Sequence, residues 1–411
     1  MVPRLYDLLR RGDWLTRDRI IAWSSVMFIV ELLVLIFLAL WQRGLLVPDV
    51  HSPASDFVSF YAAGNLTLAG VPQYAYDQVI HYLVQQQSSG AEAPHQFFFY
   101  PPVFLLLCAP LATMQYLVAF AVFVFATLAM LLRVLQAVLR EPPASWLSAA
   151  FAFPAVFWTI GLGQNAFLTT ALFGAFTLLL EKKPVTAGLL LGCLCYKPHF
   201  GLLVPVALLA GREWRAFAGA AISVAGLVGV SLVLFGWQTW GAYLTAFIHS
   251  DQVYTTGTVD FAGIITPFGA ARLLGLENSA AYAIQILATM FSVVIVALVW
   301  RRGGNHNLRC ATLLSATLLA IPLALVYDQM LLLLAAAWLV REARETGMRS
   351  WEGFVFVLIY PVSLVTLTVG QSYHLPLGPL TTCAVLTLCL RRAWSPQPRF
   401  VPYAAPLGVT P

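Results

Sequence analysis

Residues 20–41 read IIAWSSVMFIVELLVLIFLALW, an almost uninterrupted apolar run that is long enough to cross a bilayer as a helix. The run follows a charged segment with five arginines and has no small-residue cleavage site, which indicates a retained helix rather than a signal peptide. Its one acidic residue is Glu31, for which pairing with a neighbouring helix is the ordinary interpretation. We therefore place residues 1–19 in the cytoplasm and residues 42–96 in a first outer loop.

Similar apolar runs recur along the whole chain. Hydrophobic residues make up 60% of its 411 positions and charged residues only 10%, whereas a soluble domain carries about 25% charged residues. The alternation of polar and apolar residues that marks a membrane β-barrel strand is absent from the sequence. The formal charge of +5 does not indicate nucleic-acid binding, because the basic residues cluster at the ends of the apolar runs. The sequence therefore predicts one all-α polytopic membrane domain over residues 1–411.

We predict about twelve transmembrane helices, with both chain ends in the cytoplasm. Of the 23 lysines and arginines, this threading leaves only Arg43, Lys197 and Arg272 on the outer side, a bias that orients the chain in a bacterial-type plasma membrane. Residues 236–279 then form a second large outer loop, and residues 392–411 form a cytoplasmic tail. The predicted crossings after the first are residues 115–139, 145–160, 164–180, 185–196, 200–210, 214–235, 280–300, 310–326, 330–340, 354–369 and 375–390.

Three regions depart from a simple series of crossings. Residues 97–114 are apolar but contain three prolines, which favours a re-entrant hairpin over a short crossing. Residues 74–87 place Tyr76 and three aliphatic residues at helical spacing, which indicates an amphipathic helix on the outer membrane surface. Residues 185–196 and 200–210 supply only about 16–18 Å of helix each, against about 30 Å of hydrocarbon. Such short spans predict a polar cavity, lined by protein, in the outer half of the molecule.

Asp56 is the first candidate site residue. It lies in SDFVSFYAAG (residues 55–64), shortly after the first crossing. A carboxylate at an apolar boundary suits a general base, because partial loss of water raises its proton affinity. The other interpretation is an N-cap for a helix that begins at Phe57. Position alone leaves both interpretations open.

Two further charged candidates fall in the predicted outer half. Lys197 lies in YKPHFG (residues 196–201), where a proline and a glycine break the helix. It suits either a point charge for phosphate or an interfacial lysine. Asp328 follows Tyr327 and interrupts an apolar run. An intramembrane carboxylate is costly, so it indicates a function unless it serves only to pair with Lys197 or Arg272.

The turn GLGQN, residues 161–165, adds two amides to these charges. Gln164 and Asn165 suit hydrogen bonds to sugar hydroxyls, and a plain turn with a helix cap is the alternative. Tyr100 and His374 are weaker candidates. The usual catalytic signatures GxSxG, HExxH, Walker A and GxGxxG are missing, and no cluster of residues predicts a metal site. All six cysteines lie in apolar runs, so we expect no disulfide.

In their order along the chain, these motifs resemble glycosyltransferase family 87, a family of membrane enzymes that use polyprenyl-phosphate sugars. The hydropathy pattern matches over nearly the whole chain. The resemblance implies a GT-C-like helical bundle and an inverting transfer, on the outer face of the membrane, from the lipid-linked sugar. The residues that carry it are 55–64, 70–77, Tyr100-Pro101-Pro102, Gly163-Gln164-Asn165, 196–201 and Tyr327-Asp328.

The resemblance assigns the role of general base to Asp56, as the acidic residue of the first outer loop. We add Lys197 and His199 as the groups that stabilise the departing phosphate, because an anion is best stabilised by charge placed in advance. Mannose is the favoured sugar, and the expected acceptor is a lipid or an envelope glycan. No cofactor beyond the lipid-linked donor is expected. The residues expected around the sugar or acceptor are Tyr327, Asp328, Gln164, Asn165, Tyr61 and Tyr100.

Two other functions compete with this reading of the sequence. A flippase or transporter of lipid-linked sugars would show inverted repeats and polar residues near the membrane midplane. The sequence has no visible repeat, and its polar candidates gather toward one face. A non-catalytic membrane assembly partner is the second alternative.

Overall fold

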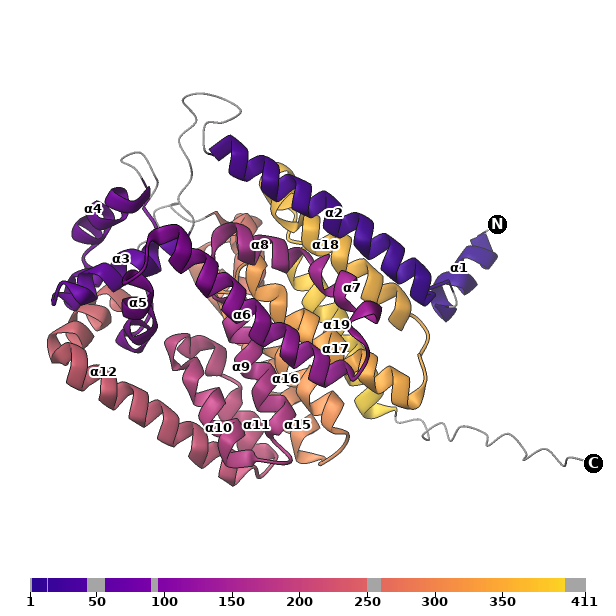
Figure 1. Cartoon of the computed structure of the whole chain (residues 1–411). Helices are drawn as coiled ribbons and strands as arrows, with labels where there is room; N and C mark the ends of the chain where they lie inside the picture. Colours follow the sequence, from indigo (N-terminus) through magenta and orange to yellow (C-terminus); the bar gives the residue numbers. More distant parts are fainter. Residues whose placement is uncertain (1, 13, 43–55, 90–94, 250–259, 396–411) are drawn as a thin grey trace, which may run out of the picture.

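The described part of the chain is helical and forms one bundle (Figure 1). The computed structural model describes residues 2–12, 14–42, 56–89, 95–249 and 260–395. Arg43, parts of both predicted outer loops and most of the predicted tail lie outside these ranges. An all-α membrane protein is confirmed by the helices that are long and apolar enough to cross a membrane. Within the described ranges these are α2 (Arg17–Gln42), α6 (Tyr116–Leu139), α12 (Trp214–Ile248), α15 (Asn278–Arg301) and α18 (Glu352–Tyr373).

Shorter helices fill most of the remaining described chain. The α-helices among them are α1 (Val2–Arg11), α3 (Phe57–Leu68), α4 (Gln78–Ser89), α5 (Leu105–Ala112), α7 (Leu147–Phe151), α8 (Pro154–Leu162), α9 (Ala166–Leu179), α10 (Pro184–Gly192), α11 (Val204–Ala210), α14 (Pro267–Leu273), α16 (His306–Ala320), α17 (Met330–Thr346) and α19 (Gly378–Trp394). The 3₁₀ helices are η1 (Pro72–Tyr76), η2 (Pro102–Phe104), η3 (Pro143–Ser145), η4 (Cys193–Tyr196), η5 (Pro198–Gly201), η6 (Phe261–Gly263) and η7 (Val326–Gln329). Extended pairing in these ranges is limited to one bridge between Ile264 and Leu325.

The apolar segments that were predicted to be short are short in the structure. α10 with η4 covers the first of them and η5 with α11 covers the second, and the break between them falls at Lys197. Residues 145–160 are divided at Pro154 into α7 and α8. In the predicted hairpin, α5 has 8 residues, which is about 12 Å of helix. Such helices do not reach across about 30 Å of hydrocarbon, so the number of twelve crossings stays a prediction.

The amphipathic helix predicted over residues 74–87 begins later than expected. One carboxylate oxygen of Asp77 accepts two backbone N–H bonds of 3.0 Å each, and this cap starts α4 at Gln78. Tyr76 lies before the cap, in η1, where its buried hydroxyl donates to the Tyr100 carbonyl oxygen at 2.9 Å. The prediction that Tyr76 faces the membrane surface was therefore wrong, because this ring packs into the protein.

The second predicted outer loop contains more helix than expected. α12 does not end near residue 235 but continues to Ile248, with a kink at Gly236. Gly236 adopts a φ of 75°, a conformation that glycine reaches without the strain a side chain would add. η6 and α14 follow in the same loop. The predicted end of the crossing at residue 235 was therefore wrong, because Gly236 redirects the helix instead of ending it.

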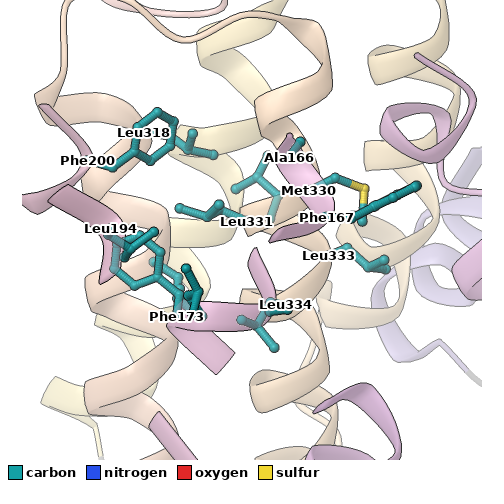
Figure 2. Packing of buried hydrophobic residues seen from close by; sticks show 14 of the residues in the cluster. Ala166, Phe167, Phe173, Leu194, Phe200, Leu318, Met330, Leu331, Leu333 and Leu334 are labelled. Atoms are coloured by element: carbon teal, nitrogen blue, oxygen red, sulfur yellow. The ribbon is translucent and has the colours of Figure 1, made fainter. Parts of the chain in front are cut away.

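Part of the core lies where α9 packs against α6 and α17. Figure 2 shows Phe167 of α9 beside Met330 and Leu333 of α17, and Phe173 of α9 beside Leu194 of η4; all five side chains are buried. Phe200, from the break between α10 and α11, inserts its ring into the same cluster. Because the break is anchored by buried apolar side chains, the backbone that carries Lys197 is held in place.

The segments predicted to be cytoplasmic meet one another at one end of the bundle. Hydrogen bonds also tie α1 to the start of α18, through the Trp351 N–H and the Arg10 carbonyl at 2.8 Å. The predicted outer candidates do not take part in these contacts. The ion pairs that join the cytoplasmic segments are Arg309–Glu213 at 2.7 Å, His306–Glu181 at 3.4 Å, Arg344–Glu141 at 3.5 Å and Arg392–Glu352 at 2.6 Å.

Candidate active site

Asp56 stands immediately before α3 but does not cap it with its side chain. Its Oδ2 instead accepts a hydrogen bond of 2.7 Å from the Gln164 amide. Phe57 fixes the start of the helix, because its buried ring packs against the rings of Tyr116 and Phe123. Burial raises the pKa of Asp56 to about 6, although the Gln164 hydrogen bond acts in the opposite direction. A carboxylate with a pKa near neutrality is suited to accept a proton.

The turn between α8 and α9 brings Gln164 to this carboxylate. Gly163 ends α8 with a φ of 64°, the left-handed conformation common at helix ends. Gln164 is buried and uses both ends of its amide. The nitrogen donates to Asp56, and the oxygen faces the Tyr100 hydroxyl at 3.5 Å and the Asn165 N–H at 3.3 Å. The turn is therefore more than a plain connection, because it orients one carboxylate oxygen of Asp56 and leaves Oδ1 without a hydrogen-bond partner among the described residues.

Tyr100 lies between the two acidic candidates. Its ring stacks on Phe104 at 4.6 Å and meets Phe60 edge to face at 5.3 Å, so its position is fixed by packing. Burial raises the pKa of the Tyr100 hydroxyl well above its usual range, and the negative charges of Asp328 and Asp56 raise it further. Since both carboxylates act on one hydroxyl, the segments that carry them converge on a common region.

Lys197 and Asp328 form a buried ion pair. The ammonium nitrogen lies 3.0 Å from Oδ1 of Asp328, and both side chains are at most 5% exposed. Oδ2 of Asp328 accepts the Leu325 N–H at 3.1 Å, so the carboxylate is fixed on both sides. The lysine also lies over the rings of Phe200 and Tyr327, at 5.1 and 5.4 Å from their centres. Of the two partners proposed for Asp328, the structure selects Lys197 and not Arg272.

His199 lies two residues after Lys197, in η5. Its side chain is accessible to water although protein surrounds it. Enclosure by the protein and the nearby charge of Lys197 lower the pKa of His199 to about 3. The ring is therefore neutral near pH 7 and offers one hydrogen-bond donor rather than a second positive charge.

Asn165 is fully buried, and its side-chain nitrogen and oxygen have no hydrogen-bond partner among the described residues. It lies close enough to Tyr100 to favour the ionised form of that hydroxyl. Its backbone carbonyl accepts from the Thr169 hydroxyl at 3.1 Å. Unpaired amide groups in such a position are costly unless a further molecule completes their hydrogen bonds.

Tyr61 is the predicted site residue that the structure places apart from this network. Its hydroxyl donates to the Met114 carbonyl at 2.8 Å, and its ring packs edge to face on Tyr116. Sequence reasoning in turn gave no role to Tyr196, whose hydroxyl shares a 2.7 Å hydrogen bond with Thr169. The sequence did contain a hint of a role for Tyr196, because this residue immediately precedes Lys197. Thr169 gave a weaker signal, one helical turn after Asn165.

Comparison with known proteins gives one match. A model of glycosyltransferase family 87 matches residues 98–325, a range that contains Tyr100, Gln164, Asn165 and Lys197. No curated protein and no solved structure matches the chain. In the described ranges, no group of three or more histidine, cysteine, aspartate or glutamate side chains is arranged to hold a metal ion.

Proposed function

This chain belongs to glycosyltransferase family 87, and from that premise we propose that it transfers a sugar with inversion from a polyprenyl-phosphate carrier to a hydroxyl of a lipid or envelope glycan. The observation that carries the proposal is the convergence of a half-buried carboxylate, Asp56, and a buried ion pair, Lys197–Asp328, on Tyr100. Asp56 is suited to remove a proton, and Lys197 is suited to bind an anion. The membership favours a transferase over the transporter that competed with it in the sequence analysis.

Asp56 is the general base in this proposal. Its Oδ1 takes the proton of the acceptor hydroxyl, while Oδ2 keeps its hydrogen bond to Gln164. The acceptor oxygen forms a bond to the anomeric carbon from the side opposite the phosphate. The bond between that carbon and the phosphate oxygen breaks, and the phosphate leaves with the electron pair. The phosphate is already a good leaving group, so the reaction needs charge stabilisation more than a strong acid.

Lys197 supplies that stabilisation. Its ammonium group has three donors, and the single hydrogen bond to Asp328 leaves two of them for phosphate oxygens. We assign Asp328 to positioning Lys197, since its second oxygen is held by the Leu325 N–H. The neutral ring of His199, two residues from Lys197 and accessible to water, contributes one more donor.

Sugar and acceptor hydroxyls are assigned to the polar groups around Tyr100. The unpaired amide of Asn165 offers both a donor and an acceptor. Gln164 and Tyr327 line the two flanks, beside Asp56 and Lys197 respectively. Tyr61 has no contact with this network in the described structure, so its assignment to substrate remains the weakest of the set. Mannose stays the favoured sugar, and the outer face of the plasma membrane stays the proposed location.

Replacement of Asp56 by asparagine tests the proposal. Protein reconstituted in lipid vesicles is supplied with a polyprenyl-phosphate sugar carrying a radioactive label and with membrane lipids as acceptors. The change keeps the size and the Gln164 contact but removes the base, and loss of a general base lowers the rate by about 10²–10⁴-fold. Asp77→Asn is the matched control, because Asp77 only caps α4 in the same segment of the chain.

The donor class is tested in the same assay. Polyprenyl-phosphate mannose, the corresponding glucose carrier and a nucleotide sugar are compared as sole donors. Transfer from the nucleotide sugar without any polyprenyl carrier would contradict the proposed donor. Full activity of Asp56→Asn with the lipid-linked donor would contradict the proposed base.

A further inference from the structure

A cavity of about 420 Å³ opens between α2, α6, α17 and α18. It shares no lining residue with the candidate active site. The segment around Trp146 closes one part of its wall, and Figure 1 shows α2 lying along the outside of the bundle beside α7. Its volume falls within the range of roughly 300–1,000 Å³ typical of pockets for small ligands. We propose that this cavity binds an acyl chain of an anionic membrane phospholipid.

The lining selects an apolar occupant. Ala336 and Ala337 of α17 leave room, and the walls around them include Trp23 and Met27 of α2 and Phe356 of α18. Water occupies a cavity only where it finds two to four polar partners, and this lining offers few. An empty apolar cavity of this size loses the dispersion contacts of all its walls. Three of the four wall helices, α2, α6 and α18, are candidate membrane spans, so lipid chains surround the cavity.

The charge at one end of the cavity selects the headgroup. Three of the four wall helices reach the cavity with residues near their predicted cytoplasmic ends: Ile20 of α2, Leu139 of α6 and Arg344 of α17. Arg344 lines the cavity there, and its side chain is 41% exposed although it pairs with Glu141 at 3.5 Å. Arg17 and Arg19 are exposed at the start of α2. Basic residues at such a boundary attract anionic lipid headgroups.

Trp23 and Trp146 fit the same placement. Both indole rings line the cavity, and Trp146 donates its N–H to the Glu141 carbonyl at 3.1 Å. Tryptophan prefers the boundary between hydrocarbon and headgroups. The polar end of the cavity is therefore at headgroup depth, and the apolar part extends from there into the hydrocarbon.

The test compares the lipid bound by the wild-type protein with the lipid bound by variants that fill the cavity or remove the charge at its end. Protein stripped of lipid in detergent is titrated with phosphatidylglycerol or with phosphatidylcholine, and bound lipid is counted by native mass spectrometry. Ala336→Phe fills the cavity, and Val26→Phe introduces the same ring at a position of α2 that is 62% exposed and outside the lining. Arg344→Gln removes the charge, with Arg301→Gln, an exposed arginine outside the lining, as its control.

Wild-type protein and both controls are expected to bind one phosphatidylglycerol in preference to phosphatidylcholine. Ala336→Phe is expected to weaken that binding about tenfold or more, because the added ring takes the space of the chain. Arg344→Gln is expected to remove the preference for the anionic lipid while leaving some binding. If Ala336→Phe does not fold, density for an acyl chain between α2 and α17 of the wild-type protein in phosphatidylglycerol nanodiscs decides the question. Equal binding by wild type and Ala336→Phe, an empty cavity in nanodiscs, or polyprenyl phosphate as the bound species would each overturn the proposal.

Discussion

At the scale of single residues, the contact between Asp56 and Gln164 makes a prediction about pH. The base must be deprotonated to act, and the pKa of Asp56 is raised to about 6. Transfer is therefore expected to rise with pH through about 6 and to level off above it. Gln164→Ala removes the hydrogen bond that favours the carboxylate, so the pKa of Asp56 rises and the acid limb moves to higher pH, by about one unit.

The measurement is the rate of transfer as a function of pH at a low donor concentration, for wild type and variant. Gln136→Ala is the control, since the Gln136 amide donates to the Glu141 carbonyl at the other end of the bundle. An acid limb that stays in place in Gln164→Ala would show that Gln164 does not act through Asp56.

Variants of the buried pair Lys197–Asp328 can distinguish its contribution to stability from its role in donor binding. Lys197→Met leaves a buried carboxylate without its partner, which is expected to cost about 3–5 kcal/mol of stability. Replacing both residues, as Lys197→Met with Asp328→Asn, removes the unpaired charge and is expected to restore most of that loss. Donor binding is expected to stay weak in the double variant, because no cation remains for the phosphate.

Thermal unfolding in detergent and binding of the lipid-linked donor are the two readouts for this pair. Arg272→Ala serves as a control for loss of the other described cation on the predicted outer side, which lies over the Phe261 ring instead. Recovery of both stability and donor affinity in the double variant would contradict the phosphate role of Lys197.

At the scale of elements, a buried ion pair with two hydrogen bonds ties the last three helices together. Arg392 of α19 makes two hydrogen bonds of 2.6 Å to Glu352 at the start of α18, and both side chains are at most 2% exposed. Its remaining donors reach the Thr346 hydroxyl at 2.7 Å and the Gly347 carbonyl at 2.9 Å, at the end of α17. Arg392→Lys keeps the charge but loses the planar fork that makes these bonds together.

We expect Glu352→Gln to lower stability by about 3–5 kcal/mol, because it leaves the Arg392 charge buried and unpaired. Arg392→Lys is expected to have a smaller effect in the same direction. Denaturation of the detergent-solubilised protein measures both, with Arg391→Gln as a control at an exposed neighbour that donates a hydrogen bond to the Ser350 carbonyl. Equal stabilities for Glu352→Gln and Arg391→Gln would show that the pair contributes little.

Elements with a strong local signal could be predicted from the sequence. Pro198 and Gly201 mark the break that carries Lys197, and the structure has it there. Tyr76 was misplaced because its spacing suits both a surface helix and a buried ring, and only the Tyr100 carbonyl, distant in sequence, decides between them. The end of α12 was misjudged because a glycine stops one helix and bends another, depending on what packs beyond it.

The candidate site could also be predicted only in part from the sequence. The identity of Asp56, Gln164 and Lys197 as polar residues in apolar surroundings is visible in the sequence. Their partners are not, because Gln164 and Asp56 are separated by 108 positions and Lys197 and Asp328 by 131. Pairings over such separations depend on how the helices pack, which periodicity in one segment does not specify.

At the scale of the whole molecule, the polar residues separate into two groups. The predicted cytoplasmic segments are joined by ion pairs at one end of the bundle. The groups around Asp56 and Lys197 form another network, which shares no hydrogen bond or ion pair with the first within the described ranges. A lipid-linked substrate requires such a division, because its sugar and phosphate must meet the enzyme at one membrane face while its chain stays in the hydrocarbon. The positive-inside bias predicts that the basic group lies in the cytoplasm and the candidate site outside.

Labelling of introduced cysteines tests this orientation. Gln78 of α4 and Lys182, between α9 and α10, are both exposed, and the predicted threading puts Gln78 outside and Lys182 in the cytoplasm. In a parent chain whose exposed Cys383 is replaced by serine, we expect Gln78→Cys to react with a membrane-impermeant thiol reagent in intact cells. Lys182→Cys is expected to react only after the membrane is permeabilised, and the parent without an introduced cysteine gives the background. Labelling of Lys182→Cys in intact cells, with Gln78→Cys protected, would show that the protein has the opposite orientation and that the candidate site lies at the cytoplasmic face.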